Sequence, residues 1–596
     1  MRARSYLFLA TDRNCLPNNG DRAGALEHIL RTISAGRQSD KDFVNSQRHS
    51  LREHLPEFAI IFLVTCIVLF LGMSLRPWVY DEGIILTAAM RVGAGQIPHR
   101  DFYANYGPAQ FYILAGLFRI FGQSILVERL YDLLIKGLLV TAVFAIAASY
   151  TRRLVAACTA IVTVLWLFSL SDLTGTPVIP VSLLNVVGSA LILPVFAGSV
   201  PTRRMLAAGA LAGFATLFRY DTGLALFCIH TCVIAIAVCS KGVSNKLHAL
   251  AYTWWPFALG FVVVTFPPLL YYLSVAPLHP FLHDIILYPS RYYHRGRNLP
   301  FPRVGPRSFE HIQVYLPIAA VGMSLYVAVA HGFSTRGNRP GPSRVSEEKT
   351  LGGFLVTFGL VAFVMYFKGY VRMEVAQMYL CIIPSLLLVA VLFQERRRFH
   401  RPLQLFTMAM AWLSVLAVAS STLHQIEKSH FYQVPVLEKM LQSRDAISPE
   451  IQMWCKLVNP LTRGLCFLPD GDRIRTIEFI DSHTTPGQLL YVGLTEHDRI
   501  FVNDNLIYFA SQRLPATHWS HFDPGLQNSY AIQQEMVQEL ELNAPPYVVL
   551  DSEFDQMHEP NDSSRSTGVT LLDQYIHKTY QHTRSFGDMS IWRRVD

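Results

Sequence analysis

Three acidic residues lie at the edge of the first long apolar segment, where charged groups are costly. Asp81 and Glu82 are adjacent, a few residues beyond the uncharged block 58–75, and Asp101 follows in His-Arg-Asp-Phe. Polar groups at the boundary of a hydrocarbon layer usually persist because they serve a function. The alternative is that they are solvated loop residues, but glycine and proline turns and aromatic residues surround them. We expect Asp81 to be a general base, with Glu82 as second choice and Asp101 as a binding group.

Basic residues accompany these acids in segments that we expect to face the same side. They are His99 and Arg100, which flank Asp101, Lys368 and Arg372 at a helix junction, and Arg291 and Arg295 in a loop rich in tyrosine. Guanidinium groups interleaved with aromatic rings suit a phosphate-bearing ligand, so we expect these six residues to hold such a phosphate. For the loop, attraction to anionic lipid headgroups stays an open alternative.

Other charged residues are better explained by structure or stay undecided. Arg219 with Asp221, and Asp132 with Lys136 one helical turn later, are expected to form local ion pairs. We predict no metal site, because the nearest candidate, His279-x-x-x-His283-Asp284, lacks a third separate ligand. Cys455 and Cys466 could be bridged, but their spacing does not decide this.

The composition indicates which elements position these residues. The chain has 596 residues, of which 51% are hydrophobic and only 16% charged, whereas soluble domains carry about 25% charged residues. Eleven apolar blocks are expected to cross a bilayer as helices, and all but one of them have 17 residues or more. They span 58–75, 130–150, 154–170, 178–197, 205–218, 222–239, 249–275, 314–332, 351–367, 375–393 and 403–422. The pattern excludes a soluble enzyme, and the net charge of +8 is spread between blocks rather than over a nucleic-acid-binding surface.

Lysine and arginine in the short connections predict the orientation. The basic clusters at 152–153, 203–204, 241–246, 334–350 and 396–401 alternate with connections poorer in these residues, so we place them in the cytoplasm. The break at Arg219-Tyr220-Asp221 must then be a turn, because one helix over 205–239 would be about 50 Å long. We therefore expect a multi-pass protein of the cell (inner or plasma) membrane with its N-terminus in the cytoplasm and its C-terminus outside.

We divide the chain into three parts. Residues 1–55 are polar and are expected to be a disordered cytoplasmic arm, or an over-extended gene start. Residues 56–423 form the transmembrane domain, whose first external loop, 76–129, carries the acids and an apolar piece at 109–122 that is too short to span. Residues 424–596 have ordinary polar content. Their predicted helices at 471–484 and 530–542, with strands at 489–494, 547–551, 580–586 and 589–594, indicate a small extracytoplasmic α/β domain.

Several motifs in these segments resemble the GT-C superfamily of membrane glycosyltransferases. The acid pair is followed by Gly95-x-x-Pro98-x-x-Asp101-Phe102 and Gly107-Pro108-x-x-x-Tyr112, and the tail carries 505–509, 513–517 and 545–550. The layout is similar to that of protein O-mannosyltransferases and of bacterial transferases that add aminoarabinose to lipid A. Some bacterial relatives carry Arg-x-Asp-x-x-His where this chain has Arg372, Glu374 and Gln377, which puts a role for position 377 in doubt.

The resemblance implies a fold of about eleven transmembrane helices with interfacial helices, and an activity. The expected enzyme moves a hexose or pentose from a polyprenyl-phosphate donor to a lipid, glycan or protein acceptor at the outer face, with inversion. The expected partners are this donor, the acceptor and membrane lipids, with no nucleic acid. Some members of the superfamily use a divalent ion, so the resemblance leaves a divalent cation possible as a cofactor. The alternative is a transporter or flippase of a lipid-linked sugar, for which related halves would be expected, and no internal repeat is found. A non-catalytic scaffold is a third possibility, against which the three acids argue.

Overall fold

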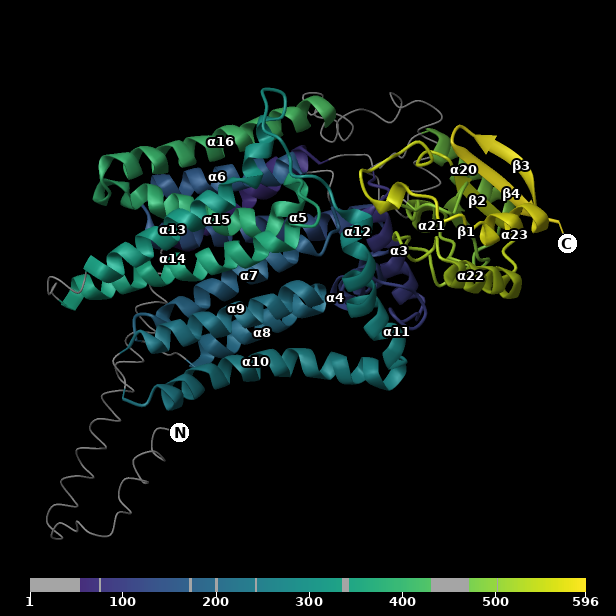
Figure 1. Cartoon of the computed structure of the whole chain (residues 1–596). Helices are drawn as coiled ribbons and strands as arrows, with labels where there is room; N and C mark the ends of the chain where they lie inside the picture. Colours follow the sequence, from purple (N-terminus) through teal and green to yellow (C-terminus); the bar gives the residue numbers. More distant parts are fainter. Residues whose placement is uncertain are drawn as a thin grey trace, which may run out of the picture. The chain divides into compact units, whose positions relative to one another are not determined.

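The structure is a computed structural model that describes residues 54–73, 77–170, 174–198, 202–241, 244–334, 342–429, 471–500 and 502–595. Most of the predicted arm, together with Cys455 and Cys466, lies outside these residues. Within them the chain is mostly helical, with a small sheet near the C-terminus (Figure 1).

Among the described residues, nine helices are long and apolar enough to cross a membrane. They are His54–Leu71, α5 (Ile125–Tyr150), α7 (Val178–Ile192) with its 3-10 extension to Val195, α9 (Tyr220–Cys239), α10 (Lys246–Val275), α13 (Leu316–Ser334), α14 (Pro342–Gly369), α15 (Tyr379–Glu395) and α16 (Arg401–Ser429). Two more, α6 (Arg153–Ser169) and α8 (Thr202–Phe218), have 17 residues each, about 26 Å of helix. All eleven predicted blocks thus correspond to helices in the described parts of the chain, and α8 and α9 are separate, as the break at Arg219 predicts.

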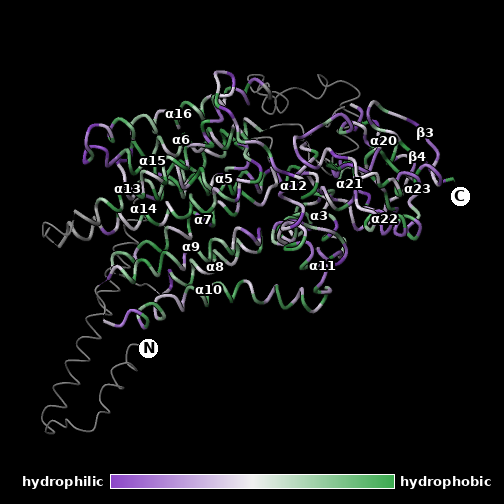
Figure 2. Tube along the Cα trace, viewed as in Figure 1, coloured by the Kyte–Doolittle hydropathy of each residue, from purple (hydrophilic) through white to green (hydrophobic). Residues whose placement is uncertain are grey.

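The long helices are apolar along most of their length, whereas the connections and the C-terminal part are mixed (Figure 2). Small residues allow some of these helices to pack closely. A Cβ atom on Gly209 of α8 would lie 1.9 Å from the Phe257 carbonyl oxygen of α10, and one on Gly260 would lie 2.0 Å from that of Leu206. Only glycine fits at such a contact, which is the usual basis of close helix packing in membranes.

The contacts group the connections as the predicted alternation requires. Leu299, in the second long connection, donates its amide to Val371 at 3.2 Å, and both lie in segments predicted to be external. On the other side, the backbone amide of Arg152 bonds to Gln394 at 3.4 Å, and both lie at predicted cytoplasmic connections. Which of the two sides faces the cytoplasm stays a prediction.

The C-terminal part is built on four strands in the order β1-β2-β4-β3. The strands are β1 (Tyr491–Leu494), β2 (Tyr547–Asp551), β3 (Tyr580–Phe586) and β4 (Met589–Arg594), with helices α20 (Gly471–His483), α21 (Leu506–Ser511), α22 (Tyr530–Asn543) and α23 (Leu571–Thr579). Strands β1 and β2 are parallel, and the other two pairs are antiparallel. All four residues of β1 and all five residues of β2 are buried, as in strands that are covered on both faces of a sheet.

The first long connection forms two helices that share a hydrophobic core with this sheet. They are α3 (Asp81–Gly93) and α4 (Pro108–Phe121). Leu86 of α3 and Phe111 of α4 belong to one buried cluster with Val492 of β1 and Val549 of β2. Helix α4 has 14 residues, so it is too short to span, as the sequence predicts.

Candidate active site

Asp81 is the first residue of α3 and has an unusual environment for a carboxylate. It is half-buried, and its Oδ1 accepts a hydrogen bond from the Tyr106 hydroxyl at 2.8 Å. It forms no ion pair with any residue that the structure describes. Burial and the neighbouring Asp81 raise the pKa of Tyr106 well above its usual value, which keeps this phenol a neutral donor. Asp81 therefore retains an oxygen atom, Oδ2, for another partner.

Glu82, the adjacent acid, is engaged in a buried ion pair. Arg129 donates Nε to Oε1 at 2.6 Å and Nη2 to Oε2 at 2.8 Å, and the Trp78 amide donates to Oε2 at 2.6 Å. The two side chains are 0% and 1% exposed. Both oxygens of Glu82 thus accept hydrogen bonds from other residues of the protein. Glu82 differs in this from Asp81, its neighbour in the chain.

Asp101 closes the turn that follows α3. Its Oδ2 accepts from the Ile97 amide at 2.7 Å, and Arg100 donates to both of its oxygens at 2.9 and 2.7 Å. The hydrogen bond from Arg100 lowers the pKa of Asp101. Both residues are partly exposed to solvent. The structure thus pairs Asp101 with Arg100, and neither contacts Asp81 in the described structure.

His99 lies inside the protein rather than on the surface of this turn. It is fully buried, with Nδ1 2.9 Å from Asp284 Oδ2 and Nε2 3.2 Å from the Tyr220 hydroxyl. Its φ of 65° is in the left-handed region, which is uncommon for residues other than glycine. These two partners come from α9 and from the second long connection, so His99 joins three segments that are distant in the sequence.

Two cations meet at one carboxylate next to Tyr106. Asp221 Oδ2 lies 3.2 Å from Arg219 and 3.0 Å from Lys368, which confirms the predicted local pair and adds a second cation from the end of α14. The Arg219 guanidinium stacks over the Tyr106 ring at 5.5 Å. Because Tyr106 also bonds to Asp81, a single side chain links the acid to this pair of cations.

A second group of cations comes from the connection between α10 and α13. Burial raises the pKa of Tyr293; two cations, Arg219 and Arg297, lower it, and two carboxylates, Asp523 and Asp81, raise it further. All four charges are therefore within electrostatic reach of this one phenol. Arg297 is 14% exposed and donates to Asp523 of the C-terminal part at 2.9 Å.

Arg372 also forms an ion pair with an acid of the C-terminal part. It donates two hydrogen bonds to Glu559, at 3.0 and 2.7 Å. Burial opposes the charge of Arg372, but its hydrogen bonds to Glu559 outweigh burial, and the pKa of Arg372 is raised; the nearby charge of Arg297 lowers this pKa. We call Arg219, Lys368, Arg297 and Arg372 the cationic cluster.

The cluster overlaps only partly with the six basic residues expected from the sequence. Lys368 and Arg372 belong to it, whereas Arg291 and Arg295 are exposed and form no ion pair in the described parts of the chain. Arg219 and Arg297 were not among the six. Signals for both were present, since Arg219 interrupts two apolar blocks and Arg297 ends the Arg-Tyr-Tyr-His-Arg-Gly-Arg run.

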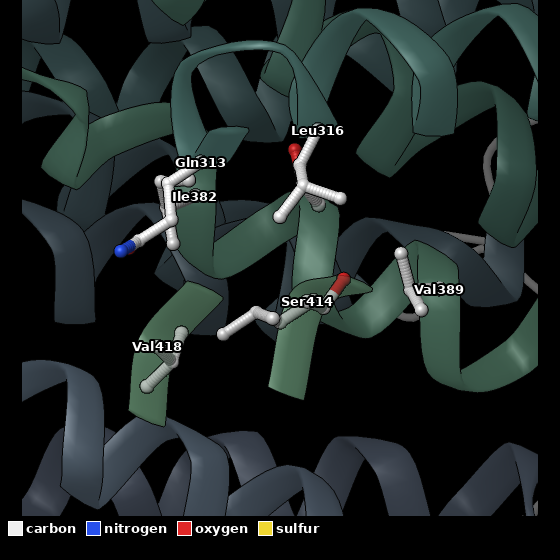
Figure 3. Close-up of a pocket in the computed structure, with 8 residues that line it drawn as sticks. Gln313, Leu316, Ile382, Val389, Ser414 and Val418 are labelled. Atoms are coloured by element: carbon white, nitrogen blue, oxygen red, sulfur yellow. The ribbon is translucent and has the colours of Figure 1, made fainter. Parts of the chain in front are cut away.

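Metal-ligand groups and one small pocket were considered as other candidate sites. Among the described residues, no group of three or more histidine, cysteine or acidic side chains is arranged to hold a metal ion. The pocket in Figure 3 is small and largely apolar, with a volume of about 10 Å³ between α13, α15 and α16. Gln313, Leu316 and Ser414 are among its lining residues. It has room for about one water molecule, which excludes it as a substrate site.

No protein-family model and no curated protein matches the sequence, but several solved structures match the fold. ArnT from Cupriavidus metallidurans in the apo state is 15% identical, covers 91% of this chain and 98% of its own, and has a TM-score of 0.52. ArnT bound to undecaprenyl phosphate gives the same identity and coverage, with a TM-score of 0.51. The oligosaccharyltransferase of Archaeoglobus fulgidus is 12% identical over 84% of this chain and 70% of its own, with a TM-score of 0.44. The likeness to ArnT shows that this chain has the GT-C membrane fold, as predicted.

Proposed function

We propose that this protein is an integral-membrane glycosyltransferase that moves a sugar from a polyprenyl-phosphate donor to a lipid, glycan or protein acceptor. The observation that carries the proposal is the environment of Asp81, a carboxylate beside the cationic cluster that forms no ion pair within the described parts of the chain. The fold adds support, because ArnT shares it and has been solved with undecaprenyl phosphate bound. We assign the cytoplasmic side to the basic connections, so that the site faces outward.

The proposed reaction is a single displacement. The acceptor hydroxyl oxygen forms a bond to the anomeric carbon while the bond from that carbon to the phosphate oxygen breaks. The hydroxyl proton passes to Asp81, and the electron pair of the broken bond leaves with the polyprenyl phosphate. Attack opposite the leaving group inverts the anomeric centre. A positioned base of this kind is usually worth a factor of 10² to 10⁴ in rate.

The cations stabilise the departing phosphate, whose charge grows as the bond breaks. We assign Lys368 and Arg372, from the expected phosphate ligands, to this task and add Arg219 and Arg297. His99 has both ring nitrogens near protein partners, so we propose that it fixes the turn that carries Asp101. Arg100, Arg291 and Arg295 remain predicted contacts to the donor, at more exposed positions.

The test is transfer of label by the purified full-length protein. Native membranes and a panel of radiolabelled polyprenyl-phosphate sugars are added to the reconstituted protein, with and without a chelator. Asp81→Asn is expected to bind donor normally and to lower transfer by about a hundredfold or more. Asp562→Asn is the matched control, because Asp562 forms only an exposed pair with Arg565, which contributes little. Wild-type turnover in Asp81→Asn would overturn the assignment.

Two further readouts test the rest of the proposal. A reporter fused after residue 423 should be active only outside the cytoplasm, and a cytoplasmic signal would move the site to the other face. If labelled donor instead crosses sealed vesicles intact, with no sugar transferred, the transporter alternative replaces the transferase.

A further inference from the structure

One loop of the C-terminal part packs tightly on the connection that carries Arg297. Pro524 accepts a hydrogen bond from the Tyr288 hydroxyl at 3.2 Å. A Cβ atom on Gly296 would lie 2.7 Å from the Pro524 side chain, and one on Gly525 would lie 2.7 Å from the Tyr292 ring. These contacts leave no room for larger side chains, so the loop and the connection have a fixed relative position.

Asp523 is the charged residue of this contact. It is 3% exposed, and four side chains from three segments surround its carboxylate. Arg297 donates to Oδ1 at 2.9 Å, while Tyr103 at 3.0 Å, Asn105 at 3.3 Å and His521 at 3.5 Å lie next to Oδ2. The backbone amide of Asp523 bonds to Gln527 at 2.8 Å, which holds the loop itself. The carboxylate is therefore held through Oδ2 and through the backbone of its loop, while Oδ1 accepts from the Arg297 guanidinium.

The pair differs from an ordinary structural ion pair in what surrounds the cation. Arg297 acts electrostatically on Tyr293 and on Arg372, and Tyr293 in turn responds to Asp81. Burial lowers the pKa of Arg297, but Asp523 outweighs this and raises it. The acid thus keeps a cation charged and oriented at the edge of the cationic cluster, although it lies in a different part of the chain.

We propose that Asp523 is a positioning residue, through which the C-terminal part sets the Arg297 guanidinium to receive the donor phosphate. This inference rests on the proposed glycosyltransferase function and deepens it. It makes the C-terminal part a contributor to donor binding at the membrane face. A misplacement of about 1 Å in such a group can cost as much as a hundredfold in rate.

The experiment measures binding of a polyprenyl phosphate without sugar to the full-length protein in detergent, together with transfer kinetics in vesicles. Asp523→Asn keeps the shape and an acceptor oxygen but removes the charge. It should raise the Kd for polyprenyl phosphate roughly tenfold, as expected for loss of one charge-assisted contact, and raise KM for the donor more than it changes kcat. Arg297→Gln should do the same. The double variant should be no worse than either single one, because both act through one group.

The matched control is Asp573→Asn. Asp573 is also a mostly buried acid of the C-terminal part, 2.6 Å from His497, and within the described residues it forms no hydrogen bond or ion pair with the cationic cluster. Because Asp573→Asn causes only a structural defect, it should lower the melting temperature of the protein and leave the Kd for polyprenyl phosphate unchanged. An unchanged Kd in Asp523→Asn, or additive effects of the two single changes, would overturn the inference.

If Asp523→Asn does not fold, the variant Asp523→Glu tests whether Asp523 positions Arg297. It keeps the charge but displaces it by one methylene, so the Kd should still rise several-fold, and a wild-type Kd would refute positioning. Failure of the proposed function looks different. In that case the wild-type protein itself neither binds polyprenyl phosphate nor transfers sugar.

Discussion

Replacing Glu82 with glutamine separates the two acids that stand side by side at the start of α3. Glu82 is fully buried and accepts three hydrogen bonds, two from Arg129 and one from the Trp78 amide. A glutamine has one oxygen and one amide nitrogen in place of the two oxygens. If the oxygen stays where Trp78 and Nη2 donate, the amide nitrogen faces the Arg129 Nε donor. One donor therefore meets another, and Arg129 loses its counter-charge.

The magnitude follows from the neighbours of Arg129. Breaking a buried ion pair by changing one partner costs about 3–5 kcal/mol. Here Glu128, also fully buried, lies 3.7 Å from Arg129 Nε and is able to take over part of the pairing. We therefore expect a destabilisation of about 2–4 kcal/mol, with turnover per folded molecule within about threefold of wild type. Asp81→Asn should show the opposite pattern, with little loss of stability and a large loss of turnover.

The assay is thermal unfolding in detergent, followed by fluorescence-detected size-exclusion chromatography, with transfer rates normalised to folded protein. Glu541→Gln is the control, because Glu541 is exposed on α22. A double variant, Glu82→Gln with Arg129→Gln, should recover part of the stability because it removes the buried guanidinium that lost its main counter-charge. If Glu82→Gln melts like the wild type but loses transfer a hundredfold, Glu82 acts in the chemistry and the structural reasoning is refuted.

Three further outcomes are expected. Burial raises the pKa of Asp551 to about 8, so the folded state binds a proton that the unfolded state has lost between about pH 4 and pH 8, and stability falls as the pH rises through this window. Asp551→Asn should therefore melt higher than the wild type at pH 8.5 and show a smaller difference at pH 5.5; equal differences at both values would contradict the assigned shift. Gly83→Ala would place a Cβ atom 2.9 Å from the Leu506 amide nitrogen, so it should lower the stability by about 1–3 kcal/mol. Gly93→Ala, at the open end of the same helix, should be tolerated. Equal melting temperatures of the two variants would show that α3 and α21 can move apart without loss of stability. Arg372→Ala should weaken binding of polyprenyl phosphate, and Arg372→Lys should restore it only in part because an ammonium group lacks the guanidinium fork; unchanged binding in the alanine variant would assign Arg372 to its bond with Glu559.

The sequence predicts local structure here far better than it predicts partnerships. Strand β2 has the predicted bounds, Tyr547–Asp551, and the turn at Arg219 separates two helices as expected. Hydropathy blocks and strand patterns are properties of neighbouring residues, so a single sequence contains them. The pair of Asp132 with Lys136, at 2.6 Å, was predicted for the same reason, since one helical turn brings the two together.

The charged contacts of the candidate site come from residues far apart in the chain. Arg297 and Asp523 are 226 residues apart, and nothing in the local pattern of either residue indicates the other. Glu82 looks equivalent to Asp81 in the sequence, but its direction from α3 brings it to Arg129 rather than to the cationic cluster. The two partners of the His99 side chain, Asp284 and Tyr220, are likewise distant from it in the sequence. Roles for all these residues in catalysis stay predictions until the variants are measured.

The hydrophobic core shared by α3, α4 and the sheet has a consequence for how the chain is made. Residues such as Leu86 and Val549 are more than 400 residues apart, so they leave the ribosome at different times. The apolar faces of α3 and α4 therefore stay uncovered by the sheet until the C-terminal part has been synthesised. The late arrival of the C-terminal part completes the fold of a region synthesised near the beginning. A C-terminal part synthesised on its own would expose the matching apolar surface and would be prone to aggregate.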